Sequence, residues 1–266
     1  MKKILLIMLV CVLALFSFTA CGGGEIPPGI AWANKEILTY QVKDKGQDIG
    51  ELEIITQRIS KDDDKYIDGK LYKDANHKIT MTYAFQDQTL TVTSLMKGMR
   101  PLATLKSVKT EEKEYVLSSY YSGKYYHYSL DQKGEKSSKR IKVKGEVVDN
   151  DIMYMYLRCF DISSGFVKML NIPDPFNNDI QSLTARRIGS KKISVPFPDE
   201  EKEVDTVAIQ ISRNTAPVGE PLFAYYTPEK DEYNIGSFAS LDNSKKFPVR
   251  IIENNLTYDL IKISVE

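Results

Sequence analysis

Few residues in this chain are suited to direct chemistry. The 266 residues include three cysteines and two histidines. The histidines, His77 and His127, stand in no motif that would pair an imidazole with a nucleophile or a metal, which argues against zinc sites. Cys159 lies in the largely apolar stretch Met153 to Phe160, which favours a buried, inert thiol over a nucleophile. The sequence therefore predicts no catalytic residue, no metal site and no cofactor.

The acidic clusters also lack the spacing of a known site. Asp62-Asp63-Asp64 is a run of adjacent carboxylates without the alternating ligands and glycine turn of a calcium loop, so we expect a solvated turn. Asp199-Glu200-Glu201 follows a proline-rich break and is typical of an exposed loop. Glycoside hydrolysis needs two carboxylates facing each other across a cleft, and the sequence singles out no such pair.

The strongest chemical signal lies at the N-terminus. Lys2 and Lys3 precede an apolar run, Ile4 to Phe16, that is too short to span a bilayer comfortably. Phe18-Thr19-Ala20-Cys21 then resembles a bacterial lipobox, which implies a diacylglyceryl group on the Cys21 sulfur and cleavage after Ala20. Several acyl chains on one residue anchor a protein stably to a membrane. The alternative is an ordinary secretory signal that is cleaved elsewhere.

The leader sets the expected organisation and location. We expect a signal peptide at 1–20, a lipidated cysteine and glycine-rich tether at 21–35, and a single β domain at 36–266. The protein would then be an extracytoplasmic lipoprotein of the bacterial cell envelope, with the membrane as a partner through its anchor. The 36 basic and 36 acidic residues balance, which excludes a long basic stripe for nucleic acid. The oligomeric state stays open.

The body of the chain has the alternation of half-buried antiparallel strands. Apolar residues recur at every second position in several runs, among them Ile79, Met81, Tyr83 and Phe85; Ile141 and Val143; and Val207, Ile209 and Ile211. Ser122-Gly123 and Gly189-Ser190 separate such runs, and both pairs predict tight hairpins.

One segment has helical spacing instead. Asp149-Asn150-Asp151 supplies side chains suited to cap a helix, and Ile152, Met155, Tyr156 and Cys159 follow at i, i+3, i+4 and i+7. We expect this helix to cover the concave face of the sheet. Its apolar residues, Ile152, Met153, Met155 and Tyr156, would then form one wall of a ligand groove, with the methionines adapting to acyl chains. The alternative is that they complete the core.

Two further clusters each permit two interpretations. Six tyrosines crowd the predicted hairpin around Gly123, where they either bind a sugar or lipid or simply pair across the strands: Tyr115, Tyr120, Tyr121, Tyr125, Tyr126 and Tyr128. Four basic residues flank Gly189-Ser190, where they either contact anionic headgroups or protect a soluble hairpin tip: Arg186, Arg187, Lys191 and Lys192.

Three segments of the chain carry a family resemblance. These segments resemble secreted bacterial proteins of the domain of unknown function 3108 family: Leu38 to Val42 with Gly46 and Gly50, the central Asp149-Asn150-Asp151 with Leu157-Arg158, and Asp242 with Lys246 to Ile251. The resemblance implies a mainly β fold: one strongly curved antiparallel sheet, like the half-barrel of periplasmic lipoprotein carriers, with one short covering helix. The family has no established reaction, so the resemblance implies no catalytic residue.

These observations favour a lipid-anchored binding or envelope-structure protein over an enzyme. A half-barrel could shelter an apolar ligand such as an acyl chain, or bind another envelope protein. The rival is an enzyme acting on envelope polysaccharide, or a carbohydrate-binding protein, that uses the tyrosine-rich face; a passive scaffold is a third alternative. A buried, converging carboxylate or histidine in a cleft would favour the enzyme, and an apolar concavity would favour the binding protein.

Overall fold

The computed structural model describes residues 34–110, 114–132, 134–197, 200–213, 222–227 and 246–266. Several predicted features lie outside these residues: the signal peptide, the lipid attachment site Cys21 and the tether. Asp242, one of the residues that carry the family resemblance, also lies outside them.

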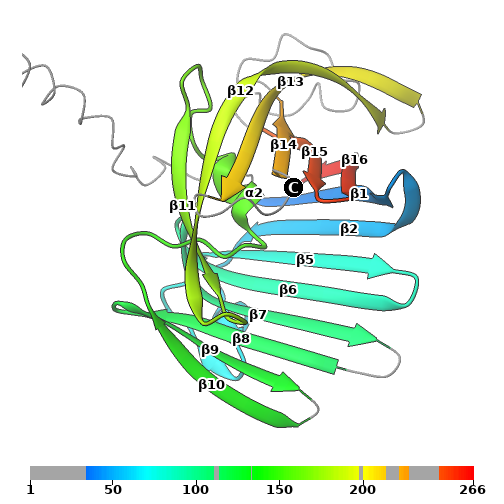
Figure 1. Ribbon diagram of the computed structural model, residues 1–266. Helices are drawn as coiled ribbons and strands as arrows, with labels where there is room; N and C mark the ends of the chain where they lie inside the picture. Colours follow the sequence, from blue (N-terminus) through cyan, green and yellow to red (C-terminus); the bar gives the residue numbers. More distant parts are fainter. Residues whose placement is uncertain (1–33, 111–113, 133, 198–199, 214–221, 228–245) are drawn as a thin grey trace, which may run out of the picture.

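Most of the described chain belongs to one antiparallel sheet of fourteen strands (Figure 1). The strands are β1 (Lys35–Asp44), β2 (Gln47–Arg58), β5 (His77–Phe85), β6 (Gln88–Lys97), β7 (Arg100–Thr110), β8 (Glu114–Ser122), β9 (Tyr125–Gln132), β10 (Glu135–Lys142), β11 (Val167–Asp174), β12 (Asp179–Phe197), β13 (Glu200–Arg213), β14 (Leu222–Tyr226), β15 (Pro248–Glu253) and β16 (Leu256–Val265). Their order is β10-β9-β8-β7-β6-β5-β2-β1-β16-β15-β14-β13-β12-β11. The first and last strands therefore pair in the middle of the sheet.

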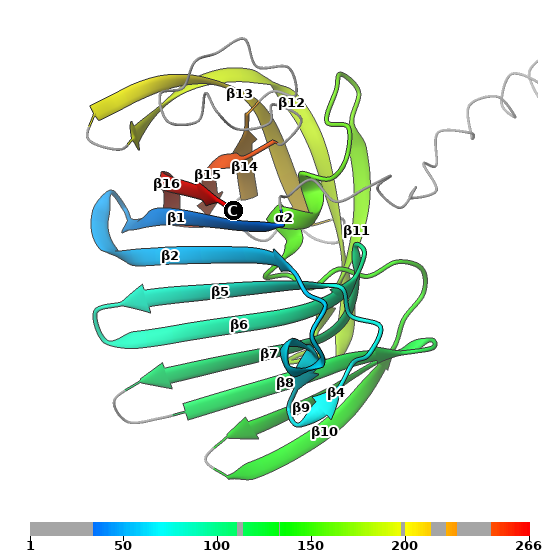
Figure 2. The same ribbon diagram turned by 180° about the vertical axis from the view of Figure 1, so that it is seen from behind.

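Alternation along the strands places the apolar face inside the curve. Ile79 and Met81 on β5 are buried in the same core as Val207, Ile209 and Ile211 on β13. The two walls face each other because the sheet curls, as Figures 1 and 2 show from opposite sides. The predicted fold class, one strongly curved antiparallel sheet with one short helix, is confirmed.

The two sheet edges, β10 and β11, are joined in sequence by residues 143–166, and this connection nearly closes the sheet into a barrel. The Val148 amide donates to the Asn171 carbonyl at 3.0 Å, and the Asn171 side-chain amide donates to the Glu146 carbonyl at 3.1 Å. The Tyr128 hydroxyl on β9 donates to the Asn178 side-chain oxygen at 3.0 Å, beside the start of β12. The connection thus bridges two edges that share no strand pairing among the described residues.

The single α-helix of the described residues, α2 (Met153–Leu157), lies inside the curve, and all five of its residues are buried. The predicted cap is wrong, because Ile152 occupies the cap position and no side chain bonds there. The carboxylate of Asp149 instead accepts hydrogen bonds from Thr104 and Tyr121 on the sheet. Burial on every side explains why a helix this short persists without a cap.

A buried ion pair ties the end of α2 to the first strand. The Arg158 guanidinium donates to both carboxylate oxygens of Glu36, at 2.5 and 3.3 Å, and neither side chain is exposed. The Arg158 guanidinium also lies over the Phe247 ring, 4.8 Å from its centroid. The Tyr226 hydroxyl on β14 donates to the Tyr154 carbonyl at 2.9 Å. These contacts fix α2 across one end of the barrel.

The predicted hairpin at Gly189-Ser190 is wrong. Strand β12 runs through both residues without turning, and its pairing with β13 shifts register between Arg187 and Gly189. Gly189 has a φ of +144°, a conformation that other residues rarely adopt. A Cβ built on Gly189 would meet no atom within 4 Å. A glycine inside a strand pattern marks a β-bulge as readily as a turn. The Ser122-Gly123 hairpin, by contrast, joins β8 to β9 as predicted.

A small excursion between β2 and β5 covers part of the outer face (Figure 2). It consists of the 3-10 helix η1 (Asp62–Lys65) and the short strands β3 (Tyr66–Ile67) and β4 (Lys70–Leu71). Ile67 packs against Leu95 and Ala103 to form a second, smaller core outside the barrel. Asp62 and Asp63 are exposed on η1, in agreement with the predicted solvated turn.

Candidate functional site

A cavity of about 860 Å³ lies between the two curled walls of the sheet. Its lining from β7, β8 and β9 consists of Thr104, Lys106, Val108, Tyr115, Leu117, Ser119, Tyr126 and Leu130. The facing wall and the strand ends contribute Ile172 to Phe176, Gln181, Leu183, Arg186, Gln210 to Arg213, Leu222, Glu253 and Asn254. The segment Asp149–Asp151, just before α2, completes it.

Strand register explains why these side chains meet. Lys106 on β7 lies opposite Leu117 on β8, and Leu117 lies opposite Leu130 on β9. Residues directly opposite one another in antiparallel strands project from the same face. On the other wall, Ile211 lies opposite Leu222 in the same way. The cavity is therefore the inner face of two strand groups that lie far apart in sequence.

The cavity lies toward one end of the barrel. Leu130, Pro175 and Asn254 stand at or next to the strand ends and turns of that end. The segment that carries α2 occupies the opposite end, where Arg158 meets Glu36 at the start of β1. One end of the barrel is thus filled by the helix, and the space beyond it forms the cavity.

The most buried carboxyl group of the cavity wall belongs to Asp149, which is only 6% exposed. Thr104 and Tyr121 donate to its two oxygens, the latter at 2.8 Å. Burial raises the pKa of this carboxyl and Asp151 adds to the effect, while the two hydrogen bonds and Lys106 act against it. Asp149 thus joins the α2 segment to β7 and β8 while presenting a carboxyl group at the cavity wall.

Two further carboxylates line the same cavity. The Lys106 ammonium donates to Asp151 at 2.8 Å. Glu253, at the end of β15, makes no hydrogen bond and no ion pair with a described residue. Burial, and then the charge of Asp151, raise the pKa of Glu253, whereas Lys106 lowers it. The wall therefore gathers three acidic groups around one ammonium group.

Phenol groups surround this acidic cluster. Burial raises the pKa of Tyr83 and Tyr258, and Asp151 and Glu253 add to both shifts. Tyr83 and Tyr258 contact each other edge to face, with ring centroids 6.3 Å apart. The acidic cluster therefore has buried phenol groups close to it as well as the aliphatic and polar side chains of the cavity wall.

The predicted groove residues lie beside the cavity but not in its wall. Ile152, Met153, Met155 and Tyr156 are each 0 or 1% exposed and belong to the main core. Their burial matches the second of the two interpretations of this helix, in which its apolar residues complete the core instead of lining a ligand groove. The wall is formed by the residues just before the helix, Asp149–Asp151, which the sequence indicated only as a cap.

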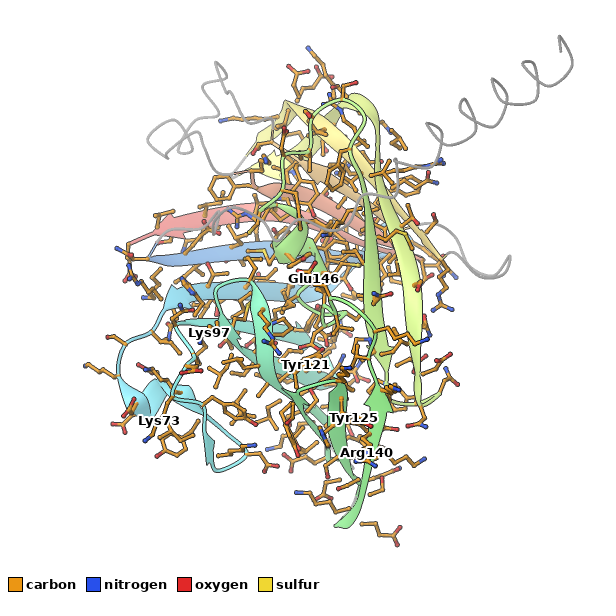
Figure 3. All side chains as sticks on the ribbon, turned by 90° about the vertical axis from the view of Figure 1, so that its left-hand side faces the viewer. Lys73, Lys97, Tyr121, Tyr125, Arg140 and Glu146 are labelled. Carbon is orange, nitrogen blue, oxygen red and sulfur yellow. The ribbon has the colours of Figure 1, made fainter. Side chains whose placement is uncertain are left out.

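The tyrosine-rich hairpin divides its rings between the two faces. Tyr115 and Tyr126 line the cavity, and Tyr121 pairs with Tyr126 across the strands at 5.1 Å between ring centroids. On the other face, the ring of Tyr125 lies under the guanidinium of Arg140, which Figure 3 shows side by side with it. The cross-strand pairing expected of these rings is present, and two of them also belong to the site.

The four basic residues predicted to contact a membrane do not share a hairpin tip. They lie along β12, where Arg186 donates to the Gln210 side chain and Arg187 donates to the Ile162 carbonyl. Lys191 lies over the Tyr225 ring at 5.8 Å from its centroid, and Lys192 is exposed. Arg186 also lines the cavity, so the structure brings only this one of the four to the site.

The described residues contain neither a membrane-spanning helix nor a cluster of metal ligands. No helix among them has the length and apolar character needed to cross a bilayer. In the same part of the chain, no group of three or more His, Cys, Asp or Glu side chains is placed to hold a metal ion.

Among solved structures, the chain is similar to a distant β-barrel-like protein. No protein-family model matches the chain, and no curated protein matches it. A crystal structure of a β-barrel-like protein of the domain of unknown function DUF1849 from Brucella abortus is similar at 9% identity, with a TM-score of 0.47. The similarity covers 88% of this chain and 99% of that one. The resemblance to the domain of unknown function 3108 family stays a prediction.

Proposed function

We propose that this protein is an envelope lipoprotein that binds an amphipathic small molecule in the cavity of its barrel. The observation that carries the proposal is the lining of the cavity. One part is aliphatic and aromatic, as at Leu117, Leu130 and Ile172, and another part holds the carboxylates of Asp149 and Asp151. Ligand sites commonly combine an apolar surface with a few polar groups that fix orientation.

The size of the cavity fits this role. About 860 Å³ falls within the range typical of small-molecule sites. A passive scaffold has no need of a cavity of this size, whereas a binding protein does. The space is therefore better explained by an occupant than by incomplete packing.

The enzyme alternative also has support, since carboxylates converge in the cavity as such an enzyme would require. Glu253, with its raised pKa, beside the ion-paired Asp151 resembles the acid and base pair of glycoside hydrolysis. Against it, Asp149 accepts two hydrogen bonds and Asp151 is paired with Lys106. Only Glu253 is unengaged by described residues, which favours binding over two-carboxylate catalysis.

Filling the cavity tests the proposal. Leu117→Trp adds a bulky ring to the cavity wall, whereas Val116→Trp adds the same ring on the outer face of the same strand. We expect Leu117→Trp to abolish saturable binding of a fluorescent fatty amine or fatty acid, and Val116→Trp to retain it. Equal binding by both variants would place the probe elsewhere and refute the proposal. Release of reducing sugar from envelope polysaccharide by the wild type would favour the enzyme.

The membrane anchor is the second part of the proposal. The lipobox-like Ala20-Cys21 junction motivates it, and the described sheet begins only at Lys35. We expect Cys21→Ser to leave the barrel folded and release it from membranes. A variant that still sediments completely with membranes after a high-salt wash would show that lipidation at Cys21 does not hold the protein there.

A further inference from the structure

A cationic surface lies at the end of the barrel that carries α2. Four exposed residues form it, from the turn between β8 and β9, from β10 and from the chain just after β10: Lys124, Arg140, Lys142 and Lys144. Strand pairing brings them together, because Lys142 lies opposite Tyr125 and the Val143 amide donates to the Lys124 carbonyl at 2.8 Å. We call these four residues the basic corner. None of them forms an ion pair with a described residue.

The carboxylates of the same three strands lie at the other end of the barrel. Glu114 begins β8, Asp131 stands next to the end of β9, and Glu135 begins β10. Antiparallel pairing places all three at the cavity end, whereas the basic corner stands at the α2 end. No carboxylate of β8, β9 or β10 therefore lies beside the basic corner.

Carboxylates from neighbouring segments already have partners. Glu146, two residues after the basic corner, accepts a hydrogen bond from the Tyr156 hydroxyl at 2.6 Å and pairs with Lys168 at 3.2 Å. Asp68, on the excursion between β2 and β5, pairs with Lys136 at 3.6 Å. These contacts leave the positive charge of the basic corner without a counterion among the described residues.

Aromatic rings accompany the cations. The ring of Tyr125 lies under the Arg140 guanidinium, which is 4.8 Å from its centroid, and Figure 3 shows both residues at the end of the barrel nearest the viewer. In the adjoining row, Tyr120 stacks on His127 at 4.7 Å between centroids, and the Lys70 ammonium lies 4.1 Å from the Tyr120 centroid. Tyrosine is enriched where proteins meet the headgroups of a bilayer, and clustered Lys and Arg attract anionic lipids.

The described chain begins at this same end of the barrel. β1 starts at Lys35, and its next residue pairs with the end of α2. Each strand from β1 to β9 is antiparallel to its neighbour in the sheet, so the turn between β8 and β9 returns to the end where β1 starts. Thirteen residues, 22–34, separate Cys21 from Lys35 and span at most about 45 Å. A lipid anchor at Cys21 would therefore keep the end with the basic corner close to the bilayer.

We infer that the basic corner binds the anionic headgroups of the membrane that carries the anchor, so that the α2 end of the barrel faces the bilayer. The charges are complementary, and each Lys or Arg near an anionic surface strengthens binding about fivefold. The cavity lies toward the other end of the barrel and then faces away from this bilayer. The inference rests on the proposed anchor and adds the orientation in which the anchor holds the barrel.

Sedimentation with vesicles tests the contact in the absence of the anchor. Residues 22–266 contain every described residue, so this soluble form keeps the barrel and lacks the leader and Cys21. We expect it to sediment at low salt with vesicles of phosphatidylcholine and phosphatidylglycerol, and to stay in solution with pure phosphatidylcholine or in high salt.

Equal sedimentation with both kinds of vesicle, or with neither, would overturn the inference. Binding to polyglutamate but not to vesicles would also overturn it and would assign the basic corner to an acidic protein. None of these results depends on the anchor or on the cavity ligand, whose own tests are the Cys21→Ser and Leu117→Trp variants.

Two double variants with the same change of charge locate the contact. Lys124→Glu with Lys142→Glu should weaken binding to the anionic vesicles by about 25-fold or more, from about fivefold for each cation. Lys45→Glu with Lys109→Glu alters two exposed lysines at the cavity end and should weaken binding by less than about threefold, because distant charges are screened. Equal losses would show that net charge alone brings the protein to the vesicles and would overturn the inference.

Labels at two hairpin tips report which end approaches the bilayer. Ser122→Cys stands beside the basic corner and Phe176→Cys stands at the cavity end; both positions are exposed, and Cys159, the remaining cysteine of the soluble form, is buried. On anionic vesicles, an environment-sensitive dye should shift its emission to shorter wavelength on the Ser122→Cys variant only. A shift on the Phe176→Cys variant alone, or equal shifts on both, would contradict the inferred orientation.

Discussion

At the scale of single residues, the protein places charged groups where water cannot solvate them and supplies a partner to most of them. The ion pair between Arg158 and Glu36 is fully buried, and Asp149 is held by Thr104 and Tyr121. Removing one partner of a buried pair leaves an uncompensated charge, which costs far more than the loss of a surface pair. These residues therefore hold the helix to the sheet, and they can be tested one at a time.

The first prediction concerns the pair that ties α2 to β1. Glu36→Ala should lower the free energy of unfolding by about 3–5 kcal/mol, because Arg158 would remain charged and buried. Lys35→Ala, at the neighbouring residue, removes an exposed pair with Glu266 and should cost no more than about 1 kcal/mol. Urea unfolding of the two variants measures both values. Equal losses would show that the buried pair contributes no more than the surface pair.

The second prediction concerns pH. The pKa of Asp149 is raised in the folded state, chiefly by burial, so the folded protein binds more protons than the unfolded chain between the two pKa values. Its stabilising contribution is therefore complete below the unfolded pKa, about 3.9, and is lost as pH rises through the folded pKa. Glu253 acts with the same sign, and Asp174 and His77, whose pKa values are lowered, act with the opposite sign.

Comparing variants isolates the contribution of Asp149. Asn can keep both contacts of the carboxylate without titrating, so Asp149→Asn should lose less stability than the wild type as pH rises from about 4 to about 7. Asp48→Asn, at an exposed position of β2, should follow the wild type. Parallel curves of unfolding free energy against pH for Asp149→Asn and wild type would rule out this role.

At the scale of elements, two features constrain the barrel: the closely packed strands and the buried helix. Gly50 on β2 has a φ of +156°, and a Cβ built there would stand 2.1 Å from the carbonyl oxygen of Ala84 on β5. No side-chain movement can relieve a clash with backbone. The alternating pattern around Gly50 gives no sign of this constraint, because it depends on a strand that pairs from elsewhere.

Our third prediction follows from that clash. Gly50→Ala should force β2 and β5 apart and lower stability by about 3 kcal/mol or more, at or above the upper end of ordinary overpacking. Gly134→Ala, in a turn with open space around the glycine, should cost much less, chiefly the strain of its φ of +83°. Thermal unfolding monitored by circular dichroism compares the two. Similar melting temperatures would mean that the strands near Gly50 tolerate a side chain.

The fourth prediction compares two methionines. Met155 on α2 is completely buried, whereas Met169 on β11 is 62% exposed. Met155→Gln should cost about 1–3 kcal/mol for an unpaired buried amide, a fall in melting temperature of several degrees. Met169→Gln should leave the melting temperature nearly unchanged. If Met155→Gln melts like the wild type, α2 is not packed in the core as the structure has it.

The elements themselves were largely predictable from sequence, and their connections were not. Alternation around Ile79 and Val207 identified strands and their inner faces correctly, because burial on one face leaves a period of two. Gly189 misled the prediction because a bulge and a turn require the same residue type. The helix was located correctly, but the carboxylate of Asp149 bonds to strands that approach only in the folded barrel.

The site was less predictable still. Lys106 and Glu253 look like ordinary polar strand residues, and the sequence offers no sign that they meet, because more than 140 positions separate them. The one available signal was Lys106 itself, which stands on the inner face of β7 between Thr104 and Val108. A charged residue on an otherwise inward face indicates either a partner or a cavity, and here it has both.

At the scale of the whole molecule, strands from the two ends of the described chain meet in the middle of the sheet. β1 pairs with β16, so the sheet can be completed only when the last strand is present. One end of the barrel is filled by α2, and the cavity lies beyond it between the two walls. The architecture thus provides a curved sheet, a buried helix inside it and a cavity lined by both polar and apolar groups.

The most direct test of this account asks whether the cavity is occupied. The full chain carrying Cys21→Ser, purified from cells without detergent, is extracted with organic solvent, and the extract is analysed by mass spectrometry. We predict an amphipathic molecule in near-stoichiometric amount from this protein and from its Val116→Trp variant, and its loss from the Leu117→Trp variant. Extracts without any such molecule, or equal amounts from all three proteins, would contradict the proposal that the barrel cavity is a binding site.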